Sequence, residues 1–396
     1  MFHQVKVNKE HRDFLRFLWW DEGDTTQEPN EYRMTVHLFG AASSPACANL
    51  SLKMTAKDNN DLGEEVVEFV KTDFYVDDGL KSVDTIEKAV PLIQKGKEMC
   101  KRGGFRLHKF TSNNKEVIGS IPVEDRAKGV ENLDLDNELL PVDRVLGVEW
   151  CMELDSFNFR ITLKDKPLTR RGILSTVCSI YDPLGFAAPF LLRGKRILQL
   201  LCKEGVNWDD PIPDVLRSQW ELWRRELLLF EQMNISIYFK PNGFRNLKTT
   251  ELHNISDASV DGYGQCSYLR IVDYNGRIHC SLVIDKSRVN PLKPITINPR
   301  MELTAALVSV KVSEMLQREH RYDKLKEFFW TDSQVVLAYI QNDTSRSKTC
   351  VANIAFNKSE IIPLRINGIT WKANIIQTIT HHEDLVCRIS FKVQHG

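Results

Sequence analysis

The part of the sequence that decides the fold is residues 251–284, which read ELHNISDASVDGYGQCSYLRIVDYNGRIHCSLVI. Runs of β-branched and aromatic residues, separated by Gly, Asp and Asn, are typical of successive strands joined by tight turns. They predict strands at 252–256, 264–272 and 278–284. The tetrapeptide Asp273-Tyr274-Asn275-Gly276 has the composition of a turn, so it is expected to join the second strand to the third.

A helix, a strand and a further helix follow these three strands. Asn298 is a favourable helix cap and Pro299 suits a first helical turn. Apolar residues then recur at the spacing of one helix face, at Leu303, Ala306, Leu307 and Val310. Residues 328–331 predict a fourth strand and residues 334–341 a short helix. This order of elements predicts an α/β layer within residues 246–396.

The region upstream of that layer, residues 156–245, is expected to be helical. Its predicted helices are 170–180, 192–202 and 213–230, with a turn at 181–185. Between residues 155 and 200 there are eight basic and three acidic residues, which makes this the clearest basic patch in the sequence. Trp208, Trp220 and Trp223 fit either packing between helices or stacking on nucleic-acid bases.

Residues 1–155 mix short strand-like runs with helical stretches, which predicts an α+β domain. The expected elements are a helix at 43–68, a hairpin at 68–83 and strands at 144–150 and 157–163. The tip of the hairpin is expected at Asp77-Asp78-Gly79, because this sequence favours a tight turn. The chain therefore divides into three parts, 1–155, 156–245 and 246–396.

The composition is that of an ordinary globular protein. Of 396 residues, 42% are hydrophobic and 27% are charged, and 53 basic residues balance 53 acidic ones. A zero net charge gives no general attraction to nucleic acid, so binding would depend on local patches or metal-bridged contacts. No apolar run approaches the roughly 20 residues that span a bilayer. We expect a cytoplasmic or nuclear protein, with no signal or transmembrane segment and no membrane partner.

Two groups of carboxylates are candidates for metal binding. Asp77 and Asp78 lie side by side at the expected hairpin tip, where a divalent cation would offset their repulsion, although such a turn is also common on a solvated surface. The second group is Asp257, Glu302, Asp332 and Asp384. The first three lie at the ends of predicted elements that can converge on one edge of the sheet. Such a cluster can hold two Mg²⁺ (or Mn²⁺) ions, while each acid alone is also compatible with a surface charge.

Several motifs of the N-terminal part resemble reverse transcriptases. Residues 74–78, Phe-Tyr-Val-Asp-Asp, look like the YxDD signature, and residues 37–45 resemble the segment that precedes it beside template and nucleotide. Residues 103–110 take the place of the Lys-bearing motif, and residues 146–150 resemble the strand used as primer grip. The resemblance implies nucleic-acid contacts at Lys109, Gly147 and Trp150.

With the motifs Tyr-Asp-Pro-Leu-Gly at 181–185 and Trp-Asp-Asp-Pro at 208–211, the order of motifs is similar to the BEL/Pao-type LTR retrotransposon polyprotein. The likeness covers nearly the whole chain. It implies an α+β palm remnant of a reverse transcriptase, a helical thumb and connection region, and an α/β ribonuclease H-like domain. The implied partners are an RNA:DNA hybrid or template-primer and other segments of the same polyprotein. Arg170 and Arg171 are then candidates for contact with the phosphate backbone.

The ribonuclease H motifs of this family resemble residues 255–259, 299–303 and 330–333, which contain Asp257, Glu302 and Asp332. Residues 381–388 take the place of the family's NPADLxSRG segment, which implies Asp384 as the fourth acid. That segment retains only Asp384, Leu385, Val386 and Arg388. Arg346 and Lys348 are candidates for contact with the backbone of a hybrid duplex, and they also fit solvated helix charges.

The polymerase site departs from the family pattern. Reverse transcriptases need a third metal-binding Asp, and in this family it lies before the segment that residues 1–5 resemble. We therefore expect an N-terminally truncated segment with an incomplete polymerase site, and two-metal hydrolysis of RNA in RNA:DNA hybrids as the surviving activity. The alternative is a catalytically inactive relic, or a module repurposed to bind nucleic acid or protein.

Overall fold

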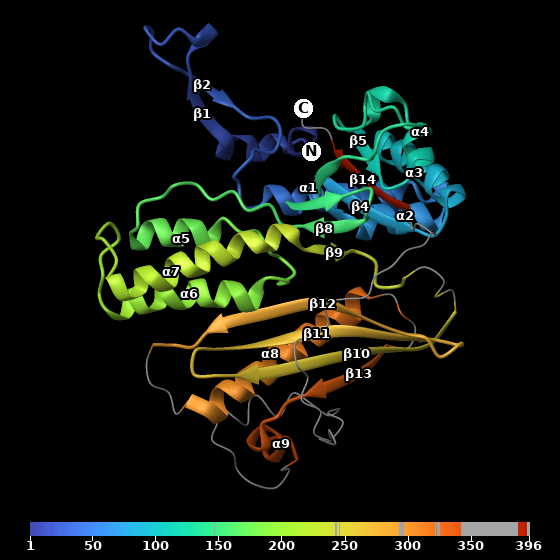
Figure 1. Ribbon diagram of the computed structural model, residues 1–396. Helices are drawn as coiled ribbons and strands as arrows, with labels where there is room; N and C mark the ends of the chain where they lie inside the picture. Colours follow the sequence, from blue (N-terminus) through green and yellow to red (C-terminus); the bar gives the residue numbers. More distant parts are fainter. Residues whose placement is uncertain are drawn as a thin grey trace. The chain divides into compact units, whose positions relative to one another are not determined.

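The computed structural model describes residues 1–145, 147–241, 244, 246–292, 297–320, 322, 325–341 and 387–393. The chain forms two compact units, Met1–Phe157 with Leu385–Gly396, and Asn158–Asp384 (Figure 1). The division into two units places no border near residue 245. Within the described part of the chain, no helix combines the length and apolar character needed to cross a membrane.

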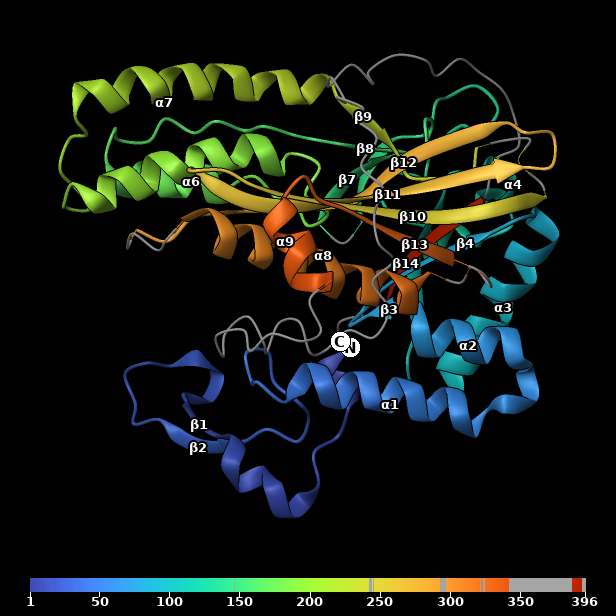
Figure 2. The same ribbon diagram turned by 90° about the horizontal axis from the view of Figure 1, so that it is seen from below.

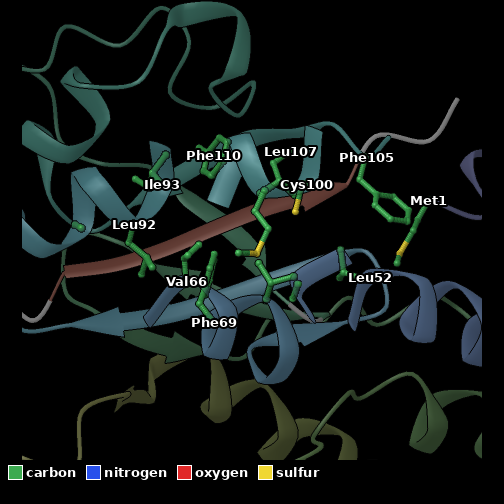
Figure 3. Packing of buried hydrophobic residues seen from close by; sticks show 14 of the residues in the cluster. Met1, Leu52, Val66, Phe69, Leu92, Ile93, Cys100, Phe105, Leu107 and Phe110 are labelled. Atoms are coloured by element: carbon green, nitrogen blue, oxygen red, sulfur yellow. The ribbon is translucent and has the colours of Figure 1, made fainter. Parts of the chain in front are cut away.

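The first unit is a mixed α/β structure. Its elements are β1 (Arg16–Trp19), β2 (Asn30–Arg33), α1 (Ser44–Asp58), α2 (Glu64–Thr72), β3 (Phe74–Tyr75), β4 (Asp78–Val83), α3 (Ile86–Arg102), β5 (Leu107–Ser112), α4 (Lys115–Gly119), β6 (Val142–Val145), β7 (Val148–Cys151) and β14 (Cys387–Val393). β8 (Ser156–Asn158) lies at its border. Buried residues of α1, α2, α3 and β5 share one apolar core, in which Leu52, Phe69, Cys100 and Phe110 are at most 2% exposed (Figure 3).

The helix expected at 43–68 is interrupted. α1 ends at Asp58, and Gly63 adopts a φ of 110°, a conformation that favours glycine, before α2 begins at Glu64. α2 then continues through residues that were expected to form a strand. It does so because Val66, Phe69 and Val70 recur at helical spacing and are buried on one face. The hairpin is correspondingly shorter than expected, since its first strand is only Phe74–Tyr75.

The C-terminal strand lies in a different unit from the one expected. β14 was included in the third part of the chain, but it pairs antiparallel with β4 and with β5 in a sheet of order β3-β4-β14-β5. The red strand in Figure 1 therefore lies between two strands that α3 connects. Without it, β4 and β5 would leave backbone donors and acceptors facing each other across an empty strand position, which is unfavourable.

The described residues of the second unit form a group of three helices and a four-stranded sheet with further helices packed beside it. Its elements are α5 (Arg170–Cys178), α6 (Ala188–Lys203), α7 (Asp214–Leu227), β9 (Asn234–Ser236), β10 (Leu247–Ala258), β11 (Gly262–Asp273), β12 (Ile278–Val289), α8 (Ile297–Glu319), β13 (Leu325–Trp330) and α9 (Gln334–Gln341). The sheet order is β12-β11-β10-β13. β13 is parallel to β10 and the other pairs are antiparallel. α8 packs on β10 and β11 (Figure 2).

The tryptophans of the helical region have two different environments. Trp220 and Trp223 are 4% and 1% exposed, and their ring centroids lie 4.9 Å apart in a stacked arrangement. Packing between helices is therefore the correct interpretation for these two residues. Trp208 is 43% exposed, and the guanidinium of Arg170 lies over its ring, 4.0 Å from the centroid.

The turn at 181–185 docks on the edge strand β12. The Asp285 N–H donates to Leu184 O at 2.8 Å, and Lys286 Nζ donates to Pro183 O at 3.0 Å. Gly185 is required here, because its φ is 83° and a Cβ would lie 1.9 Å from Asp285 O. The carboxylate of Asp182 accepts hydrogen bonds from Gly185 and Ala187 N–H, just before α6 begins. Hydrogen bonds within the turn and hydrogen bonds to β12 thus stabilise the same conformation of residues 181–185.

This contact predicts a pH-dependent effect on stability. Burial, reinforced by the charge of Asp182, raises the pKa of Asp285 to about 7. The folded state therefore holds this proton more tightly than the unfolded state, so stability falls as pH rises from about 4 to about 7. Asp285→Asn should raise the melting temperature at pH 8, with a gain that disappears near pH 4.

The control is Asp273→Asn in the neighbouring strand β11. Burial alone would raise the pKa of Asp273, but the hydrogen bonds and charge of Arg277 hold it below its usual range. That variant should lower the melting temperature at pH 8, because it removes a favourable ion pair. A lower melting temperature for Asp285→Asn at pH 8 would contradict the assignment.

Candidate metal centre

Three of the four acids predicted in the second unit converge in the structure. Asp257, Glu302 and Asp332 each offer a carboxylate oxygen, and these oxygens all lie within 4.8 Å of one another. Among the described residues, they form the one group of three or more metal-ligating side chains. The convergence predicted from the ends of elements is therefore confirmed for these three. Asp384 lies outside the described residues.

Each acid is positioned by the element that carries it. Asp257 lies near the end of β10, paired in register with Gly264 of β11. Glu302 lies near the start of α8, which packs on the same strands. Asp332 lies two residues after the end of β13, in the short connection to α9, where the Ser333 hydroxyl accepts from Val336 N–H at 3.3 Å. Because β10 and β13 are adjacent and parallel, their C-terminal ends meet at one sheet edge.

The electrostatics of the cluster centre on Glu302. Burial raises its pKa to about 7, and the charges of Asp257 and Asp332 add to this effect. Glu302 Oε2 is buried and has no hydrogen-bond partner among the residues that the structure describes. None of the three acids has an ion-pair partner within the part of the chain that the structure describes. Binding of a cation would relieve the repulsion among these three carboxylates.

A divalent metal fits this set of donors. Mg²⁺ and Mn²⁺ prefer carboxylate oxygens and accept one or two protein carboxylates completed by water and phosphate. The orphaned Glu302 Oε2 and the mutual repulsion of the three acids are both relieved by such an ion. Asp257, Glu302 and Asp332 are therefore the residues that would hold it.

The other pair of acids lies on a tight hairpin in the first unit. Tyr75 pairs with Asp78, so the turn residues are Val76 and Asp77, and Asp78 is already the first residue of β4. The expected tip at Asp77-Asp78-Gly79 is therefore shifted by one residue. Val76 has a φ of 57°, a conformation that is strained for a β-branched residue and that a two-residue turn of this kind normally assigns to glycine.

The surroundings of Asp77 and Asp78 differ from those of the acids in the second unit. Among the described residues, these two belong to no group of three metal-ligating side chains. On the neighbouring strand β14, the residue in register with Asp78 is Lys392. The backbone pairing thus brings a basic rather than an acidic residue to the position opposite Asp78.

The residues implied as primer and template contacts have diverse environments. Lys109 is exposed on β5 with a φ of 56°, and Gly147 has a φ of 85° in the turn between β6 and β7. Trp150 is 1% exposed, and its indole N–H donates to Asp155 Oδ1 at 3.0 Å. Trp150 is therefore a core residue of this unit, and the expected contact of its ring with nucleic acid is not supported.

The basic patch is partly neutralised by acids that are distant in sequence. Arg171 forms a two-pronged ion pair with Asp209, at 2.8 and 3.0 Å. Arg193 pairs with Glu226 at 2.7 Å, and Arg196 pairs with Asp261 at 3.0 Å. The patch therefore presents less positive charge than the sequence suggests. Arg346 and Lys348 lie outside the described residues.

Part of the second unit is similar to a known protein family. Residues 169–333 match the family model described as "Pao retrotransposon-like RNaseH-like domain". The match begins at the cap of α5 and ends one residue after Asp332, so it includes Asp257, Glu302 and Asp332. No curated protein matches the chain in sequence.

Among solved structures, the chain is similar to foamy viral protease-reverse transcriptase. The structure in complex with RNA/DNA hybrid has a TM-score of 0.53 and 14% identity, covering 97% of this chain and 45% of that one. The dRH form in complex with ds DNA has a TM-score of 0.49 and 14% identity, covering 93% and 55%. The chain thus spans about half the length of these viral proteins. At this identity the similarity concerns the fold.

Proposed function

We propose that the chain hydrolyses the RNA strand of RNA:DNA hybrids with divalent metal, since residues 169–333 match the model of the Pao retrotransposon-like RNaseH-like domain. The observation that carries the proposal is the convergence of Asp257, Glu302 and Asp332 within 4.8 Å. Paired divalent ions at such a cluster activate water and stabilise the leaving oxygen of a phosphodiester. The expected products end in a 3′-hydroxyl and a 5′-phosphate.

The three acids have different tasks in this proposal. Asp257 and Asp332 are exposed, so they can reach ions that also contact a phosphate outside the protein. Glu302 is half-buried, and its raised pKa means that metal must compete with a proton near neutral pH. Metal affinity should therefore rise as pH increases through about 7. Asp384 is the fourth acid that the family resemblance implies.

The first unit is proposed to be a palm remnant without polymerase activity. Residues 1–155 carry the hairpin with Asp77 and Asp78, and residues 156–245 are assigned to a thumb and connection region. The proposal is supported by the position of the two acids outside any described group of three ligands, and by Lys392 opposite Asp78. Primer extension by the purified chain that Asp77→Asn abolishes would contradict it.

Cleavage of a labelled hybrid tests the proposed hydrolysis. The purified full chain should cut the RNA strand of an RNA:DNA hybrid in Mg²⁺ or Mn²⁺, should stop when the metal is chelated, and should spare single-stranded RNA. A folded preparation with no hybrid-dependent cleavage would favour the alternative, a retroelement relic that binds nucleic acid or protein without chemistry. The cluster supports the catalytic interpretation, because three neighbouring carboxylates with no ion-pair partner among the described residues repel one another unless they hold a cation.

Nucleic-acid binding is proposed to involve Arg170, a half-buried residue of the basic patch whose guanidinium donates to Val206 O and lies over the exposed ring of Trp208. Each phosphate that a cation neutralises contributes about −0.9 to the slope of log affinity against log salt concentration. Arg170→Gln should therefore flatten the slope for duplex binding by about one if Arg170 contacts phosphate. Arg171→Gln should have a smaller effect, because Arg171 is already paired with Asp209.

Arg193→Gln is the matched control for that measurement, because Arg193 belongs to the same sequence patch but pairs with Glu226. We expect its slope to equal that of the wild-type chain. If all three variants had the same salt dependence as the wild-type chain, the basic patch would not be part of the proposed interface.

A further inference from the structure

A continuous chain of polar contacts runs along one face of the sheet beside the metal centre. The indole N–H of Trp330 donates to His253 Nδ1 at 3.1 Å. His253 Nε2 lies 3.1 Å from Glu251 Oε2, and Arg270 Nη1 donates to the same oxygen at 2.7 Å. The chain thus connects three strands, since Trp330 is on β13, His253 and Glu251 are on β10 and Arg270 is on β11.

The donors and acceptors in this chain have a single consistent arrangement. A tryptophan N–H can only donate, so His253 Nδ1 must accept and Nε2 carries the proton that is donated to Glu251. Burial alone would raise the pKa of Glu251, but hydrogen bonds from His253 and Arg270 hold it below its usual value. Glu251 therefore accepts as a carboxylate and fixes the tautomer of His253.

Ring stacking reinforces the hydrogen bonds. The imidazole of His253 stacks on Phe328, with centroids 4.9 Å apart and planes at 11°, and on Trp330, at 5.8 Å and 24°. In register, His253 pairs with Phe328, and Ile255 pairs with Trp330. The imidazole of β10 therefore lies between two aromatic rings of β13.

The contact between Trp330 and His253 lies next to the strand ends that carry two of the acids. Ile255 and Trp330 are the last paired residues of β10 and β13, and Asp257 and Asp332 each follow two residues later. Both acids thus lie just beyond the last pair between β10 and β13, while Asp257 still pairs with Gly264 of β11. Their carboxylate oxygens lie within 4.8 Å of each other, and like charges at this distance repel, so the two chain ends need contacts that hold them together. The Trp330 side chain is 41% exposed, and its indole N–H and its ring both contact His253.

We propose that His253 is a positioning residue for the metal centre, because it anchors Trp330 and thereby holds the end of β13, with Asp332, against the end of β10, with Asp257. The inference rests on the proposed metal-dependent function. His253 touches neither metal nor substrate and acts through Trp330. No sequence motif marks it, because Glu251, His253 and Trp330 come together only when β10 and β13 pair.

Binding of Mn²⁺ by the purified full chain tests this role, with melting temperature measured in parallel. His253→Phe keeps a flat ring but removes both hydrogen bonds, and Trp330→Phe keeps a ring but removes the donor. Each should weaken Mn²⁺ binding about tenfold, at the lower end of the range for residues that orient ligands indirectly. The double variant should be no weaker than either single variant, because both remove the same interaction.

Two further variants separate positioning from general stability. His253→Asn places an amide oxygen near the position of Nδ1, so it should retain most of the Mn²⁺ affinity. Phe328→Leu disturbs the other side of the stack without touching the Trp330 hydrogen bond, so it should lower the melting temperature and leave Mn²⁺ affinity unchanged.

The outcomes distinguish this inference from the proposed function. Wild-type chain whose Mn²⁺ binding is absent or insensitive to Asp332→Asn would refute the proposed function itself. Wild-type binding that depends on Asp332 but is unchanged in folded His253→Phe would overturn the positioning role alone. Additive losses in the double variant would overturn it as well, because they would show two independent effects.

Discussion

Asp332→Asn should reduce Mg²⁺-dependent cleavage of an RNA:DNA hybrid by about a thousandfold, which corresponds to losing several kcal/mol of metal-based stabilisation. The substitution keeps the volume of the side chain but removes one of the charges that converge within 4.8 Å. Hard divalent ions bind anionic oxygens far better than amide oxygens, so the loss should appear in metal affinity and in rate. Asp257→Asn should behave in the same way, and Asp384→Asn should be milder, since its sequence motif is already altered.

The same variant should not be destabilised. Asp332 is exposed and lies among like charges, so removing its charge relieves repulsion with Asp257 and Glu302. Its melting temperature without metal should equal or exceed that of the wild-type chain. Asp214→Asn, a change at a side chain 94% exposed on α7, is the matched control and should cleave normally. Full cleavage by Asp332→Asn would move the active site elsewhere.

Trp223→Ala should lower the free energy of unfolding by about 4 kcal/mol, the size expected for removing a large buried aromatic side chain. The ring is 1% exposed and lies between Trp220 and Phe190, with centroids 4.9 and 5.3 Å away. Its indole N–H donates to Phe190 O at 3.0 Å, so the substitution also removes this hydrogen bond. The shift in the midpoint of urea unfolding measures the loss.

Trp208→Ala is the control for that experiment. Trp208 is 43% exposed and mainly supports the guanidinium of Arg170, a contact that contributes about 0.5–1 kcal/mol at an exposed site. It should unfold at nearly the wild-type midpoint. Wild-type stability together with weaker duplex binding in Trp223→Ala would instead indicate a base-stacking residue and would contradict the packing described for α6 and α7.

The secondary structure of the second unit could be read from the sequence because its signals are local. Residues 334–341 were expected to form a short helix, and α9 spans those residues. The strands predicted at 252–256, 264–272 and 278–284 all lie within longer strands of one sheet. Alternating burial and turn residues such as Asp273-Tyr274-Asn275-Gly276 depend on near neighbours, so they are visible in one dimension.

The first unit was harder to predict because its helix and strand signals compete over a few residues. Glu68 to Thr72 was expected to begin a strand, whereas burial of Phe69 and Val70 on one face of α2 continues a helix. The position of β14 could not be inferred either, since pairing with β4 and β5 joins residues about three hundred positions apart in the sequence. The unpaired edges of β4 and β5 that bind β14 exist only once these two strands have assembled into a sheet.

The sequence by itself predicted that Asp257, Glu302 and Asp332 lie close together, because each marks the end or start of an element with its own local signal. Only the tertiary structure decided the charge state and the burial of individual side chains. Burial of Glu302 raises its pKa, Asp209 neutralises Arg171, and the core encloses Trp150. Each of these effects depends on distances between groups that are remote in sequence. Charge interactions and burial depend on those distances, and the distances cannot be read from the order of residues along the chain.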